Sequence, residues 1–288
     1  MNSTVPATGR NPDRRPQGVP SDITAMGNTE MGFWDHVEAL RGVLLRSAGV
    51  LVVLMAAYFA VMPRLFDSVI LAPCRADFML YGILDALGAP SGEAMQDINL
   101  VNINLTSQFL IHMSASFWLA VVTAFPIVIY LLWGFVSPGL YESEKRGAPV
   151  AFGAGVVMFF AGAATGYFLV FPLTLRFLAD YRLSDLIPNY ISIDSYMDTF
   201  LMLVFVMGLV FELPVVTWLL GKAGIMDRTL FDRYRRHAIV GLLVLSAVVT
   251  PTGDPFTLSV VFVPLYLLWE VSAFTVPKPV TTIQQELT

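Results

Sequence analysis

The chain has 288 residues, of which 56% are hydrophobic and only 14% charged, with a formal net charge of −5 and a mean hydropathy of +0.68. Because soluble domains carry about 25% charged residues, this composition excludes an ordinary soluble protein and predicts an α-helical protein that crosses a membrane several times. The one cysteine, Cys74, excludes an intramolecular disulfide.

The first thirty residues differ in composition from the rest. They are polar and rich in Pro, Gly, Asn and Arg, so we expect 1–30 to be a disordered tail. Residues 31–276 are expected to form one membrane domain, followed by a C-terminal tail, 277–288. Arg14 and Arg15 are followed by polar residues and prolines rather than an apolar core, so this pair is not a twin-arginine export signal.

Six apolar segments follow the tail, each bounded by charged residues or proline. The last two are short, because 12–14 residues rise only about 18–21 Å, whereas the bilayer core is about 30 Å thick. We therefore expect a hydrophobic mismatch at the fifth and sixth spans. The six segments are approximately 43–62, 111–136, 149–171, 196–220, 238–249 and 256–269.

The distribution of Lys and Arg predicts the orientation. With the N-terminus in the cytoplasm, thirteen of the 17 basic residues lie inside and four outside. Cytoplasmic loops carry the excess of Lys and Arg, and six spans return the chain to the starting side, so both termini are predicted inside. The four outer residues are Arg64, Arg75, Arg176 and Arg182.

Two further patterns concern helix geometry. In the long loop 63–110, apolar residues at i, i+3, i+4 and i+7 predict an amphipathic helix that caps the outer face. Prolines inside the apolar segments should kink the spans and favour a curved, cup-like wall, except that Pro172 should end the third span. The apolar positions are Leu80, Ile83, Leu84 and Leu87, and the kinking prolines are Pro126, Pro214 and Pro264.

Glu212 lies inside the fourth apolar segment, at a depth where lipid tails are expected. An ionisable side chain at a helix centre costs about 3 kcal/mol on insertion scales and usually has a functional role. One hypothesis is a polar docking point for partner helices, and an alternative is the proton or ion site of a secondary transporter. Transporters often show paired repeats and broken helices, but we find no convincing repeat and no second carboxylate at similar depth. An intramembrane enzyme would also need a second catalytic group.

An acidic spot is predicted at the cytoplasmic face. The amphipathic segment 33–41 precedes the first span, and the first cytoplasmic loop carries two carboxylates. Carboxylates bind guanidinium groups bidentately, so this spot is suited to an arginine-bearing peptide. Local ion pairing is the alternative for the loop, which contains Glu142, Glu144, Lys145 and Arg146.

Several motifs, in order along about residues 33–275, resemble the TatC family, the receptor subunit of the twin-arginine protein translocase. F-W-D-H-V-E-A-L-R at 33–41 resembles the family's H-L-x-E-L-R motif, and 126–146 resembles its second span with the P-x-L-Y-x-x-E-R/K-R loop. F-E-L-P at 211–214 matches F-E-x-P, and T-P-T-G-D-P-F at 250–256 resembles the T-P-P-D-x-F turn.

This resemblance implies a six-span, N-in and C-in protein of the bacterial cytoplasmic (inner) membrane. The family recognises twin-arginine signal peptides on folded proteins and assembles with single-span TatA- or TatB-type subunits, and with further copies of itself, into an export machine driven by the proton motive force. It implies no enzymatic activity, cofactor, metal or nucleic acid.

The resemblance also assigns roles to residues. Glu144 corresponds to the loop glutamate implicated in reading the arginine pair, Glu212 with Pro214 to the intramembrane docking site, and Asp254 to the outer-turn aspartate. The expected signal-peptide site comprises Glu144, Glu142, Glu38, His36, Leu40, Arg41 and Tyr141.

Two positions depart from the family pattern. The glutamate of the N-terminal motif aligns with Ala39, and Glu38 lies one position earlier, about 100° away on a helix. A glutamine that the family often carries early in the sixth span aligns with Leu258, so we expect fewer polar groups around Glu212.

Overall fold

The computed structural model describes residues 33–87, 97–136, 148–184, 186–187, 189–222 and 224–276, most of them helical. The chain divides into two units, 1–41 and 42–288. In the first unit, the described residues 33–41 form the first turns of helix α1 (Phe33–Leu65). The tails predicted at 1–30 and 277–288 lie outside the described residues.

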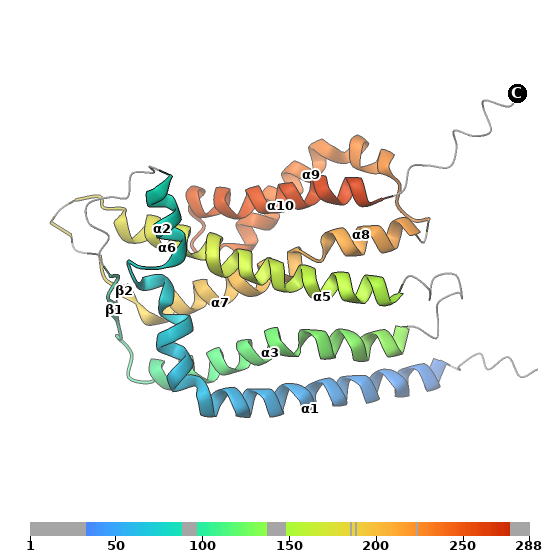
Figure 1. Ribbon diagram of the computed structural model, residues 1–288, viewed down its shortest axis with the longest axis horizontal. Helices are drawn as coiled ribbons and strands as arrows, with labels where there is room; N and C mark the ends of the chain where they lie inside the picture. Colours follow the sequence, from blue (N-terminus) through green and yellow to red (C-terminus); the bar gives the residue numbers. More distant parts are fainter. Residues whose placement is uncertain are drawn as a thin grey trace, which may run out of the picture. The chain divides into compact units, whose positions relative to one another are not determined.

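The second unit is built from long helices joined by short segments at their ends. Figure 1 shows α3, α5 and the α7–α8 pair side by side, and α9 lies against α10. After α1 the elements are η2 (Phe66–Ile70), η3 (Ala72–Cys74), α2 (Met79–Ala86), β1 (Leu100–Val101), α3 (Ser107–Val136), α5 (Ala148–Thr165), η5 (Gly166–Val170), α6 (Phe171–Asp180), β2 (Ile191–Ser192), α7 (Ile193–Val210), α8 (Leu213–Lys222), α9 (Arg228–Val249) and α10 (Pro255–Thr275).

Five helical stretches among the described residues are long and apolar enough to cross a membrane. α9 is consistent with the sixth crossing, because its charged first turns precede an apolar part that begins at Ala238. That apolar part is short, as predicted, whereas the 21 residues of α10 rise about 31 Å. The predicted all-α, multi-span class is confirmed by the stretches His36–Ala86, Ser107–Phe135, Pro149–Asp180, Ile193–Lys222 and Pro255–Thr275.

The prediction that Pro172 ends the third span is wrong. The helix continues from α5 through the π-helical turn η5 into α6 and reaches Asp180. Pro172 lies in the first turn of α6. Proline is tolerated in a first turn because its missing N–H would have no intrahelical partner there.

An irregular segment at the outer end, residues 66–74, is held by tyrosine hydroxyls. π- and 3₁₀-helical turns break the regular α-helical hydrogen-bond pattern, and three carbonyls of this segment accept hydrogen bonds from side chains of α2, η5 and α7. The hydroxyls of Tyr81, Tyr167 and Tyr196 donate to the carbonyl oxygens of Pro73, Val69 and Ile70, respectively.

The amphipathic helix predicted in the same loop is present as α2, but its buried face differs from the predicted one. Leu80 and Tyr81 are buried, whereas Ile83 and Leu87 are 45% and 76% exposed. These two buried side chains pack together with Phe78 in a small apolar cluster. Farther along the chain, β1 and β2 pair in parallel and join the two long outer loops.

A proline near the outer end of α1 is compensated by a histidine of α3. Pro63 has no N–H, so the carbonyl of Phe59, four residues earlier, loses its usual donor. His112 Nε2 lies 2.8 Å from that carbonyl oxygen, and the two rings stack at 4.0 Å. This contact joins α1 to α3 at the level where α1 would otherwise expose an unpaired carbonyl.

Candidate functional site

The fourth span is broken at the predicted glutamate. α7 ends at Val210 and α8 begins at Leu213, so Phe211 and Glu212 form a turn between two helices. Pro214 lacks an N–H and leaves the Val210 carbonyl without its i+4 donor, which confirms the interruption predicted at this proline. Glu212 is ten residues, or about 15 Å, from the inner end of α8 at Lys222.

The carboxylate of Glu212 lies against bare backbone of the third span. A Cβ placed on Gly155 of α5 would be 3.1 Å from Glu212 Oε2, so no larger residue fits there without displacing the carboxylate. The Glu212 side chain is half-buried, and its Oε1 is buried without a hydrogen-bond partner in the described part of the chain. A buried oxygen without a donor costs about 1–3 kcal/mol, and more when it is charged.

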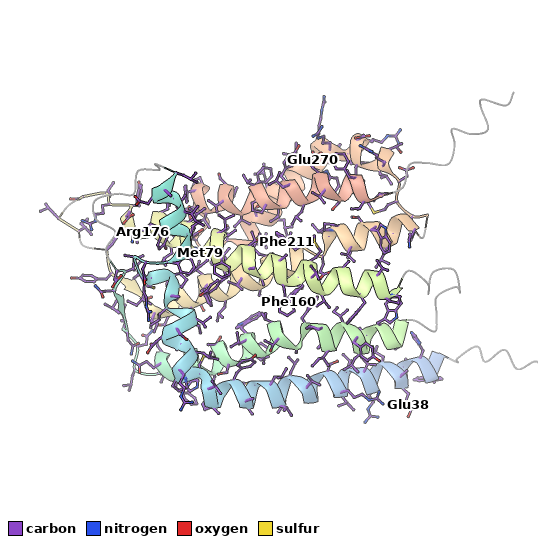
Figure 2. All side chains as sticks on the ribbon, in the orientation of Figure 1. Glu38, Met79, Phe160, Arg176, Phe211 and Glu270 are labelled. Carbon is purple, nitrogen blue, oxygen red and sulfur yellow. The ribbon has the colours of Figure 1, made fainter. Side chains whose placement is uncertain are left out.

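Glycines of α5 and of the first position of η5 let α7 approach closely enough to fix this geometry. Gly155, Gly162 and Gly166 are separated by seven and four residues and therefore lie on one helix face. A Cβ on Gly162 would collide with the carbonyl oxygen of Met207 and come within 2.7 Å of Phe211 Cβ. Figure 2 labels Phe211, the residue directly before Glu212, where the α7–α8 turn lies against α5.

The structure does not bring Leu258 close to Glu212. The carbonyl oxygen of Pro214 accepts a hydrogen bond from Thr217 Oγ1 at 3.1 Å and from Thr275 Oγ1 at 3.5 Å. Thr275, at the inner end of α10, therefore lies near the level of Glu212. Leu258 is 275 − 258 = 17 residues earlier in α10, about 25 Å along the helix axis. Its apolar side chain thus leaves the immediate surroundings of Glu212 unchanged.

Asp254 caps the helix that follows the outer turn. Its Oδ1 accepts from the backbone N–H of Thr257 at 2.7 Å, and its Oδ2 accepts from the Thr252 hydroxyl at 2.6 Å. Gly253, with φ of +60°, supplies the left-handed backbone that the turn requires. Burial alone would raise the pKa of Asp254, but the hydrogen bonds from Thr252 and Thr257 outweigh it and lower the pKa below its usual value.

We expect Asp254→Ala to lower the free energy of unfolding by about 1 kcal/mol, because it removes the N-cap of α10. Asp254→Asn keeps the capping oxygen, so its free energy of unfolding should fall by less than that of Asp254→Ala. Since the folded-state pKa is lowered, the contribution of the charge is present above the unfolded pKa, near 4, and disappears as the pH falls through the folded value. Thermal unfolding of both variants at pH 7 and pH 3 measures this, and equal midpoints for alanine and asparagine would contradict the cap.

Comparison with known proteins decides the family. The family described as "Sec-independent protein translocase protein (TatC)" matches residues 35–264. The chain belongs to the TatC family. It is 33% identical over 239 residues to the Sec-independent protein translocase protein TatC of Deinococcus radiodurans, covering 83% of each chain. It is also 33% identical over 245 residues to the TatC of Azotobacter chroococcum mcd 1, covering 85% of this chain and 89% of the relative.

Solved TatC structures share the fold. A crystal structure of the twin-arginine translocase receptor TatC matches with a TM-score of 0.66 and 29% identity, covering 83% of this chain and 97% of that one. A second, of the same receptor in DDM, matches with a TM-score of 0.68 and 28% identity, covering 83% and 98%. The resemblance stated from the motifs is confirmed, and the chain is a multi-span membrane subunit of a Sec-independent protein translocase.

The structure describes only part of the signal-peptide site inferred from the TatC motifs. His36, Glu38, Leu40 and Arg41 lie in the first turns of α1, and all four are exposed. Glu38 (labelled in Figure 2) and Ala39 are successive residues of a helix. Their side chains therefore differ in direction by about 100° around the helix axis, as predicted. The loop residues Tyr141, Glu142 and Glu144 lie outside the described residues.

Sequence reasoning missed two features of how the helices of this TatC-family chain pack. The first is the glycine face of α5, for which the spacing of small residues in a span is a usable signal. The second is an ion pair between the last two spans, in which Arg235 of α9 donates from Nε and Nη2 to Glu270 Oε1 at 2.9 and 2.6 Å. Arg235 also donates to the Tyr266 hydroxyl at 3.2 Å. No local pattern links two residues on separate helices.

Proposed function

We propose that the chain is the signal-peptide receptor and scaffold of a twin-arginine translocase in the bacterial inner membrane, exporting folded proteins with the proton motive force. The TatC family match over 35–264 supports this, since the solved relatives are named as twin-arginine translocase receptors. We further propose that single-span TatA- or TatB-type subunits dock at Glu212, and that Glu144, Glu142 and the first turns of α1 bind the signal peptide.

The observation that carries the docking proposal is the buried Oε1 of Glu212 beside Gly155. An acceptor already desolvated in the free protein can gain a hydrogen bond without a further desolvation cost. At Gly155, the absence of a side chain leaves only backbone facing the carboxylate. A polar donor on a neighbouring membrane helix satisfies this oxygen, as side-chain hydrogen bonds across helices do within membranes.

The secondary-transporter alternative has less support. The helix break at Glu212 is a feature that transporters also show, but the match to the TatC family places this break in a translocase subunit. A transporter would bind and move a small solute or ion with Glu212 as its site. Solute uptake in vesicles that depends on Glu212 would favour that alternative.

Export of a folded reporter tests the receptor function directly. The reporter carries a twin-arginine signal, and its periplasmic fraction is measured in cells with and without the gene. We expect export to be lost on deletion and restored by the intact gene. Normal export in the deletion strain, in a host without a second copy, would overturn the proposal.

Glu144→Gln should weaken signal-peptide binding about tenfold, because hydrogen bonds to charged groups contribute about 1.5–3 kcal/mol. Photo-crosslinking between the purified protein and a labelled twin-arginine peptide measures the loss. Glu142→Gln is the matched control in the same loop and should lose less. A peptide with both arginines replaced by glutamine should bind intact protein and the Glu144 variant equally; a Glu144 effect that persists with this peptide would contradict arginine recognition.

A further inference from the structure

Helix α9 presents different faces to the protein and to the bilayer. Phe231, Leu242 and Val249 are buried along one face of α9, and this helix packs against α10. On the opposite side, three valines four residues apart are strongly exposed: Val240 at 61%, Val244 at 59% and Val248 at 70%. Residues four apart lie on one helical stripe, so these valines form a continuous lipid-facing surface.

The four arginines at the start of α9 divide between these faces. Arg235 is exposed but turned toward α10, where it pairs with Glu270 and Tyr266, and Arg228 lies 5.0 Å over the Phe274 ring. Arg233 and Arg236 are exposed, and neither forms a salt bridge to a residue that the structure describes. Figure 2 labels Glu270 on α10, the helix against which α9 packs.

Nearby acidic groups offset the charge of this pair only in part. Asp227 caps α9, accepting from the Thr229 hydroxyl and from the Leu230 N–H, and these hydrogen bonds, with a smaller contribution from the charge of Arg233, lower its pKa. Asp232 is exposed and lies four residues before Arg236, on the same helix face, but no salt bridge joins these two residues in the described part of the chain. The exposed surface therefore keeps a local excess of positive charge.

The arginines continue the valine stripe at its cytoplasmic end. Arg233, Arg236 and Val240 are three and four residues apart, and Arg236 is about 6 Å from Val240 along the axis. Valines at hydrocarbon depth thus place two guanidinium groups at the level of lipid headgroups. Because guanidinium binds phosphate oxygens bidentately and each basic residue near an anionic membrane surface gains about 1 kcal/mol, the two parts of the stripe match the two parts of one phospholipid.

We propose that Arg233, Arg236, Val240 and Val244 form a binding surface for an anionic phospholipid of the cytoplasmic leaflet. The headgroup phosphate lies on the two arginines and an acyl chain lies along the valines. A free phosphate ion would leave the valines unused, and an apolar partner helix would contribute no negative charge to the arginines. The surface does not involve Glu212, so it is independent of the proposed docking of partner subunits.

Native mass spectrometry of the whole protein, titrated with phosphatidylglycerol or phosphatidylcholine in detergent, tests this surface. The double variant R233Q/R236Q should bind phosphatidylglycerol about 25-fold more weakly, about fivefold for each arginine, with phosphatidylcholine binding unchanged. R233K/R236K keeps the charge and should retain most of the affinity. The matched control is R64Q/R182Q, which removes two exposed arginines from the outer end.

Three outcomes would overturn the proposal. One is an equal loss of phosphatidylglycerol affinity in the control variant R64Q/R182Q, because any two exposed arginines would then bind the lipid. Another is an equal weakening of the binding of both lipids, which would show that the surface does not distinguish lipids by headgroup charge. The third is unchanged lipid binding together with lost crosslinking to a single-span subunit, which would make the surface a protein contact. Equal elution volumes in gel filtration establish that the variants are folded.

Discussion

Replacing Glu212 by alanine should reduce the co-purification of a TatA- or TatB-type subunit at least tenfold, while signal-peptide crosslinking changes less than twofold. The carboxylate has a buried oxygen without a donor beside Gly155, and a hydrogen bond to a charged group contributes about 1.5–3 kcal/mol. The predicted signal-peptide residues belong to other segments of the chain, so the two activities should separate. Crosslinking to each ligand in the same membranes measures both.

Two further variants separate hydrogen bonding from simple loss of volume. Glu212→Gln keeps an acceptor oxygen and nearly the same shape, so it should retain more of the partner than alanine does. Gly155→Ala leaves Glu212 intact but places a methyl group 3.1 Å from the present position of Oε2, so the carboxylate must move. We expect an intermediate loss of partner. Equal losses of partner and signal peptide in Glu212→Ala would refute the docking role.

The fourth span shows what the sequence could predict about the site. A glutamate in an apolar segment and a proline two residues later indicate a functional interruption from local chemistry alone, and the structure has a turn at that point. The partner surface of the glutamate was not predictable in the same way. Gly155 is 57 residues earlier, 212 − 155, and becomes its neighbour only because α5 and the α7–α8 turn meet in the folded protein.

Leu258 and Pro172 show two different reasons for failure. Leu258 aligns with a family glutamine, but an alignment does not give the depth of a residue in the membrane. Along the axis of α10, most of the helix separates Leu258 from the level of Glu212. Pro172 follows the rule that proline ends helices, yet a preceding π-helical turn places it in a new first turn where the rule does not apply. Both errors concern position along a helix rather than the existence of the helix.

The short apolar part of α9 was predictable, whereas its partners were not. Counting apolar residues is enough to find that 238–249 is shorter than the bilayer core. The sequence does not indicate which arginine of α9 faces α10, because four arginines occur within nine residues. Packing against α10 selects Arg235 for Glu270. That choice leaves Arg233 and Arg236 exposed on the same face as the lipid-facing valines.

Replacing Gly162 by alanine should destabilise the protein by about 1–3 kcal/mol, the usual cost of overpacking. The new methyl group would meet the Met207 carbonyl oxygen and lie 2.7 Å from Phe211 Cβ, so the backbones of α5 and α7 must separate. Thermal unfolding should show a midpoint several degrees lower, since about 1 kcal/mol corresponds to 2–4 °C for a chain of this size class. The shift should also carry the adjacent Glu212 away from Gly155 and weaken partner binding.

Gly153→Ala is the matched control, because it lies on the same helix and its Cβ would have no atom within 4 Å. Alanine is favoured over glycine inside a helix by about 0.5–1 kcal/mol, so this variant should be as stable as the original or slightly more so. The opposite signs expected for the same substitution nine residues apart isolate the close approach of α5 and α7 as the cause. Matching midpoints for the two variants would mean that the interface tolerates a methyl group, and Glu212 would then owe its position to the Pro214 turn alone.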